Sequence, residues 1–275
     1  MVRGEDEADF CITSRAGVVE KPALMGGEQL PRSVLDVLGF KVEESDNDFF
    51  LTRWFGTGFG WGVNLFVGIP LRGLMNGGLS APVDVGTAGC YVGNSCFREL
   101  FEETGLADFL KEVNHSGFVS IRMNSDTMQV VGVETGVPGW GLYNILEGLP
   151  GTIGDFLAEP QACCFSESWT VGLLLSRFPY PLEKETKTAA RIYGLSRATE
   201  KHFWLGPHEQ FRNSTTTRST VVGVATSWAK RLSEADNRAV GTCRSIMVEQ
   251  AQYRTDTYAV AGQVWGRLKN AGVVG

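Results

Sequence analysis

A glycine-rich segment at residues 70–90 constrains the fold more than any other stretch of the chain. It reads PLRGLMNGGLSAPVDVGTAGC, with five glycines, two prolines and few charges, and it follows an aromatic, strand-like run. The segment is longer than a hairpin turn, and its composition is too specific for a flexible linker. Glycines let backbone amides approach an anion closely. We therefore expect a loop that lines a ligand site, and the alternative is a glycine-rich structural crossover.

The composition is typical of a globular protein with a core of its own. Of the 275 residues, 43% are hydrophobic and 20% are charged, and the formal net charge is −6. This length allows one or two domains. The negative charge argues against a broad nucleic-acid or membrane-binding surface, so neither partner is expected. The longest apolar runs have about five residues, far fewer than the roughly 20 of a membrane-spanning helix.

The N-terminus and the cysteines predict a cytoplasmic protein. The first residues, MVRGEDEADFC, are acidic and lack the apolar stretch of a secretory signal. Residues 1–14 are expected to be disordered or loosely attached. The six cysteines form no C-x-x-C pair and there are three histidines, so neither a zinc site nor a disulfide framework is expected.

Hydrophobic periodicity predicts a mixture of strands and helices without strict alternation. Residues 48–68 are expected to form two strands folded back on each other. Residues 117–135 predict a hairpin whose turn begins at Asn124. Short helices are expected over residues 141–149 and 152–160.

The pattern changes after Pro160, where buried strands precede one clear helix. Ser233 is expected to cap this helix. Together these patterns predict an α+β protein of two domains with a boundary near residues 155–162. The residues expected on the buried stripe of the helix are Ala235, Ala239, Cys243 and Ile246.

Six pieces of the chain form an ordered set of motifs. In the first part they are VVEKP at 18–22, the glycine-rich segment, and VVGVETGVPGWG at 130–141. In the C-terminal part they are the strand VVGVA at 221–225, the helix from Ser233, and the Y-R-x-D signature at 253–256. In this order they resemble the phosphoribosylamine–glycine ligase (glycinamide ribonucleotide synthetase) family of the ATP-grasp superfamily.

The resemblance covers about residues 16–265 and implies a domain organisation. Residues 15–158 are expected to form an ATP-grasp-like domain that is truncated at its N-terminus. Residues 160–275 are expected to form a small α+β C-terminal domain of the family's type. The family's N-terminal domain has no counterpart here, so a separate chain that supplies it is an expected partner, and shortened relatives encoded by bacteriophages are one plausible source.

The activity implied by the resemblance is ATP-dependent carboxylate–amine ligation in purine nucleotide synthesis. Glycine, or another carboxylate, attacks the γ-phosphate of ATP and forms an acyl phosphate. Phosphoribosylamine, or another amine, then displaces phosphate. The implied cofactors are ATP and Mg²⁺ or Mn²⁺, which neutralise charge around the triphosphate.

The resemblance also implies roles for individual residues. Lys21 would hold phosphates, and the alternative is an exposed lysine at a strand end. Glu134 would bind the metal, with Asn124 as a supplement, and the alternative is a solvated acid. Arg72 and Asp84 would act in catalysis. The glycines that would bind the nucleotide are Gly26, Gly27, Gly77, Gly78 and Gly86.

Three departures from the family pattern support a second hypothesis. Gly136 stands where the family has an asparagine as the second metal ligand. The acidic hinge residues with which the family holds adenine and ribose are replaced by TRWF at 52–55. Gly26 and Gly27 lack the lysine that separates the glycines of the family's phosphate-covering loop. The chain would then be a non-catalytic or split relative that acts as a binding or subunit module. Weak or absent glycine ligation by this chain alone is expected.

Overall fold

The computed structural model describes most of the chain from residue 48 onward. The described residues are 48–56, 60–61, 66–72, 84–91, 105–137, 141–159, 168–180, 183–212 and 214–272. The predicted sites at Lys21, Gly26, Gly27, Gly77 and Gly78 lie outside these residues, as does the expected loose N-terminus.

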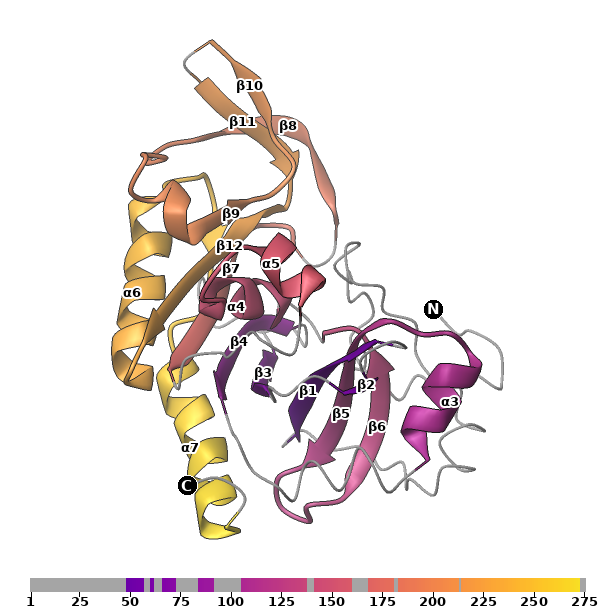
Figure 1. The fold of residues 1–275 in the computed structure, drawn as a ribbon. Helices are drawn as coiled ribbons and strands as arrows, with labels where there is room; N and C mark the ends of the chain where they lie inside the picture. Colours follow the sequence, from indigo (N-terminus) through magenta and orange to yellow (C-terminus); the bar gives the residue numbers. More distant parts are fainter. Residues whose placement is uncertain are drawn as a thin grey trace.

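A ten-stranded antiparallel sheet organises the described part of the chain (Figure 1). Its path is β6-β5-β1-β3-β4-β7-β12-β9, with β2 paired to β1 and β13 paired to β7. The bounds are β1 Asp48–Gly56, β2 Gly60–Trp61, β3 Phe66–Arg72, β4 Asp84–Tyr91, β5 Gly117–Asn124, β6 Val130–Thr135, β7 Trp169–Arg177, β9 Phe203–Leu205, β12 Val221–Ala229 and β13 Ala251–Gln252.

A smaller sheet of three antiparallel strands lies beyond β12, at the top of Figure 1. Its order is β10-β11-β8, and most of its side chains are at least partly exposed. The chain passes between the sheets through a short 3₁₀ turn, η2. The bounds are β8 Glu185–Ile192, β10 Glu209–Phe211, β11 Ser214–Ser219 and η2 Glu200–His202.

Two pairings predicted from the sequence are confirmed. Strands β1 and β3 pair antiparallel, as expected for residues 48–68. Strands β5 and β6 form a hairpin in which Asn124 begins the turn: its side-chain oxygen accepts the backbone N–H groups of Asp126 at 2.8 Å and Thr127 at 3.0 Å. This local turn chemistry is typical of asparagine.

Helices cover both faces of the large sheet. On one face, α3 (Leu106–Glu112), α6 (Leu232–Ser245) and α7 (Thr257–Asn270) contribute to the main hydrophobic core. On the other, α4 (Gly141–Gly148) and α5 (Ile153–Ala158) contribute to a smaller core. Alternate residues of β7 point to opposite faces of the sheet. Val171 and Leu173 point into the main core. Gly172, between them, faces α4, because a Cβ at this position would lie 2.1 Å from Asn144 Oδ1.

The helix predicted after Pro160 is present as α6, and its buried stripe is confirmed. Ala235, Ala239, Cys243 and Ile246 are all at most 2% exposed. The predicted cap is wrong, because Arg231 is the N-cap residue and no side chain caps the helix. Leu232 enters the core as the first helical residue, which places the following serine inside the first turn. No helix among the described residues is long and apolar enough to cross a membrane.

The large sheet continues across the predicted domain boundary. Strand β4 pairs with β7 from Gly86 opposite Leu173 to Gly89 opposite Thr170, so residues before and after Pro160 share backbone hydrogen bonds. A division near residues 155–162 stays a prediction. Any two such domains would meet within one continuous sheet.

Candidate functional site

Polar side chains gather on one face of the β1, β5 and β6 strands. Residues directly opposite each other in antiparallel strands point to the same side. One row across these strands is Thr52, Ser120 and Glu134, and the next is Phe50, Arg122 and Gly132. We call these six residues the polar face, because four of them, Thr52, Ser120, Arg122 and Glu134, have polar or charged side chains. The intervening residues on the reverse side, Leu51, Ile121 and Val133, belong to the main core.

Two buried hydroxyls connect the strands of the polar face. Ser120 Oγ donates to the carbonyl of Gly136 at 2.7 Å, and it lies 2.8 Å from Thr52 Oγ1. Since the Ser120 proton is used in the first bond, Thr52 is the donor in the second. The bond holds Gly136 just after β6 with a φ of 116°, a conformation that residues with a Cβ rarely adopt. This backbone conformation therefore favours glycine where the family has asparagine.

An aromatic cluster closes one end of the polar face. The Trp54 ring meets Phe118 and Phe156 edge-on, at centroid distances of 5.1 and 5.2 Å. Trp54 Nε1 is buried and has no hydrogen-bond partner among the residues that the structure describes, so it is a donor available to a bound molecule or water. Phe55 is fully buried in the main core on the opposite side. Of these two neighbouring aromatic residues of β1, Trp54 is therefore the one on the side of the polar face.

Glu134 and Arg122 provide the charges of the polar face, and both are buried. Glu134 is 5% exposed and Arg122 is 4% exposed. Mg²⁺ bound by protein carboxylates usually has one or two of them plus phosphate oxygens. Of the six residues of the polar face, Glu134 is the one carboxylate. These donors therefore suit an ion that arrives on phosphate oxygens and do not form an all-protein cage.

Asn124 has a structural role in the described turn. Its side-chain oxygen accepts the two backbone N–H groups that fix the β5–β6 turn, and the residue is 9% exposed. Its place on β5 is four residues beyond Ser120, which is opposite Glu134. Four residues of strand span about 13 Å. Its proposed role as a supplementary metal ligand stays a prediction.

The predicted residues of the glycine-rich segment are brought together by the β3–β4 pairing. Arg72 is opposite Asp84, and Leu71 is opposite Gly86. The row of Glu134 reaches β3 at Phe66, six residues from Arg72. At about 3.3 Å per residue and 4.8 Å per strand, the backbones of Arg72 and Glu134 are roughly 20 Å apart along the strands and about 14 Å across them. The described site residues thus form two groups.

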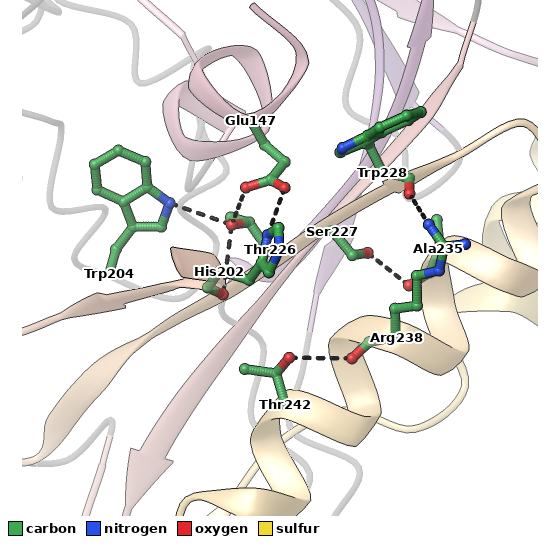
Figure 2. A network of polar contacts seen from close by, with 9 residues as sticks. All are labelled: Glu147, His202, Trp204, Thr226, Ser227, Trp228, Ala235, Arg238 and Thr242. Carbon is green, nitrogen blue, oxygen red and sulfur yellow. Dashed lines mark hydrogen bonds and ion pairs between the residues drawn. The ribbon is translucent and has the colours of Figure 1, made fainter. Parts of the chain in front are cut away.

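A second polar cluster lies between α4 and the β9–β12 edge of the sheet (Figure 2). The carboxylate of Glu147 contacts His202 Nδ1 at 2.9 Å through one oxygen and accepts the Thr226 hydroxyl at 2.6 Å through the other. Trp204 Nε1 donates to Thr226 Oγ1 at 3.2 Å. The Glu147 side chain is 7% exposed and that of His202 is 48% exposed. This arrangement orients His202 and leaves part of its ring in solvent.

Three residues of the polar face and the second polar cluster, Arg122, Glu147 and Thr226, were not identified from the sequence. Arg122 could have been found, because an arginine within a predicted buried strand, on the same side as Glu134, is unusual. Glu147 and Thr226 gave no comparable signal. They are 79 residues apart and meet only through the packing of α4 on β12.

Comparisons with known proteins support the fold. No family model matches the chain, and no curated protein sequence matches it. Phosphoribosylamine–glycine ligase from Thermotoga maritima is similar in structure, with a TM-score of 0.57 and 14% identity over 77% of this chain and 56% of that one. Rhizobium etli pyruvate carboxylase has a TM-score of 0.51 and 12% identity over 84% of this chain and 25% of that one.

These likenesses define the class of fold. The chain has the fold of ATP-grasp ligases, a group that includes phosphoribosylamine–glycine ligase. It spans about half the length of that ligase and a quarter of the carboxylase. At such low identity the shared feature is the fold alone.

Proposed function

We propose that the chain is an ATP-grasp carboxylate–amine ligase with a divergent site. The observation that supports this most is the pair of buried charges, Arg122 and Glu134, on one face of a sheet whose fold resembles that of phosphoribosylamine–glycine ligase. The proposed substrates are glycine or another carboxylate, and phosphoribosylamine or another amine.

The proposed cofactor is ATP with Mg²⁺ or Mn²⁺, which would reduce the negative charge on the transferred phosphoryl group. Glu134 would contact the ion, with Asn124 as the proposed supplement. Lys21, Arg72 and the segment glycines are proposed to bind or activate the phosphates, and Asp84 is proposed to act in catalysis. Arg122 would add positive charge, and Trp54 Nε1 would offer a hydrogen bond to the bound molecule.

The proposal is tested first by binding. Isothermal calorimetry with ATP and Mg²⁺ should show saturable binding that weakens in Glu134→Gln. An ADP-release assay with glycine and phosphoribosylamine then tests ligation, with Glu134→Gln beside it. Absence of ATP binding over a range up to millimolar nucleotide would contradict the proposal.

A non-catalytic relative is the second candidate, and specific observations favour it. Asn124 is engaged in its turn, and Gly136 has a backbone conformation that favours glycine where the family has a second metal ligand. If ATP binds but no ADP is released with any carboxylate and amine tried, this candidate is preferred. A binding or subunit module would be its function.

A further inference from the structure

Arg177 is a buried cation at the junction of the two sheets. It is the last residue of β7 and is 4% exposed. Its Nη1 donates to Thr186 Oγ1 of β8 at 3.0 Å, and this bond joins the large sheet to the small one. Because arginine stays protonated in proteins, a full positive charge is enclosed at this point of the fold.

The guanidinium of Arg177 has few partners within the protein. Its Nε is buried and has no hydrogen-bond partner among the residues that the structure describes. None of the ion pairs between described residues involves Arg177. A buried charge is costly unless an opposite charge and hydrogen bonds balance it. The hydroxyl of Thr186 is neutral, so it accepts one hydrogen bond without balancing the charge.

Arg254 shows how the chain uses the same part of a guanidinium elsewhere. Arg254 is 5% exposed, and its Nε and Nη2 donate to the two carboxylate oxygens of Asp256. This pair of nitrogens is a fork of parallel donors that matches two oxygens of a carboxylate or phosphate. In Arg177 the bond to Thr186 uses Nη1, which lies outside the fork. Its Nε therefore remains a donor for an incoming oxyanion.

The charges around Arg177 also favour an anion. The Thr186 hydroxyl contacts the carbonyl of Arg218 at 3.2 Å, so the backbone of a second arginine lies beside the site. The side chain of Arg218 is exposed. Glu185 precedes Thr186 on β8 and is exposed, and alternation points it to the other side of the strand. The carboxylate that is nearest along β8 is thus directed away from the guanidinium.

This site is separate from the polar face. The row of Phe50 on the polar face continues through Gly68 and Gly89 to Thr170 of β7. Arg177 is seven residues beyond Thr170, and this odd number places it on the reverse side of the sheet. Leu175, two residues before Arg177, belongs to the main core on that side. A ligand of Arg177 would therefore not share the proposed nucleotide site.

We propose that Arg177 anchors a second binding site, whose ligand is an oxyanion. A carboxylate or phosphate group would accept from Nε and Nη2 and supply the missing negative charge. Since Arg177 is almost fully enclosed, the ligand would be a small anion or the end of a larger molecule. The site goes beyond the proposed function and does not depend on it.

Thermal unfolding with two probes tests the site. At constant pH and ionic strength, about 50 mM inorganic phosphate or acetate should raise Tm by at least about 3 °C over chloride alone. The probe with the larger effect identifies the phosphate or the carboxylate as the preferred group. Arg177→Lys keeps the charge and loses the fork, so it should lose most of the rise. Arg218→Lys is the matched control at an exposed arginine and should keep the rise.

The variants separate specific binding from a general salt effect. Phosphate salts stabilise many proteins without binding to a site, and such an effect would be the same in Arg177→Lys as in the unaltered chain. That result would overturn the proposal, as would a Tm that neither probe raises above its value in chloride. If Arg177→Lys does not fold, Arg177→Met takes its place in the same comparison. Failure of ATP to bind would contradict the proposed function and leave this test unaffected.

Discussion

Replacing Thr226 by valine should destabilise the protein although the two side chains have nearly the same shape. Thr226 is fully buried, and its hydroxyl both donates to Glu147 at 2.6 Å and accepts from Trp204 at 3.2 Å. Hydrogen bonds to charged groups contribute about 1.5–3 kcal/mol. The indole N–H adds little, because Trp204 is 40% exposed and water can replace the bond. The expected loss is about 2–3 kcal/mol.

The measurement is a thermal unfolding curve, in which a loss of this size should lower Tm by about 4–10 °C for a chain of this length. Thr226→Ser is the matched control, since it keeps the hydroxyl and removes one methyl group. If only apolar burial mattered, valine would be the more stable of the two variants. A Val variant at least as stable as the Ser variant would therefore refute the role of the hydroxyl. In Glu147→Gln the penalty for valine should become smaller.

Three further outcomes are expected. Gly172→Ala should lower the free energy of unfolding in urea by about 1–3 kcal/mol, because the new Cβ would lie 2.1 Å from the side-chain oxygen of Asn144 in α4. Gly241→Ala, where the new Cβ has open space around it, should instead stabilise α6 by about 0.5–1 kcal/mol. Burial, with a contribution from Asp256, raises the pKa of Asp236 to about 6, so the stability contributed by its protonated form is present near pH 4 and lost as pH rises through 6. Between pH 4 and pH 7 the free energy of unfolding of Asp236→Asn should therefore rise by about 2–3 kcal/mol relative to that of the unaltered chain. A difference between the two proteins that does not change with pH would contradict this. Burial raises the pKa of the Cys243 thiol to about 12, so maleimide followed by peptide mass mapping should label it only after unfolding.

The fold could be predicted in part from local sequence patterns. The β5–β6 hairpin follows from alternation and from Asn124, whose side chain closes the turn with hydrogen bonds two and three residues away. The buried stripe of α6 follows from helical periodicity. The start of that helix did not follow, because burial of Leu232 outweighs the capping preference of the next residue.

The last helix, α7, was not predicted although its pattern is present. Its buried residues Thr257, Ala261, Val264 and Leu268 recur at helical spacing. Two of them are small or polar, so their burial depends on close packing against α6 and the sheet. The motifs that resemble the phosphoribosylamine–glycine ligase family predicted the fold better than hydrophobic periodicity did. The structural likeness to the Thermotoga maritima ligase, at 14% identity, supports that fold.

The sequence by itself determined which residues could face a ligand, and the tertiary structure decided which of them meet. Alternation along β5 and β6 places Arg122 and Glu134 on regular faces, but only the strand register makes them diagonal neighbours. Glu147 and His202 are 55 residues apart and are joined by the packing of α4 beside β12. The physical reason is range: turns and periodicity depend on neighbours within a few residues, whereas strand order and helix packing depend on the free energy of the whole core.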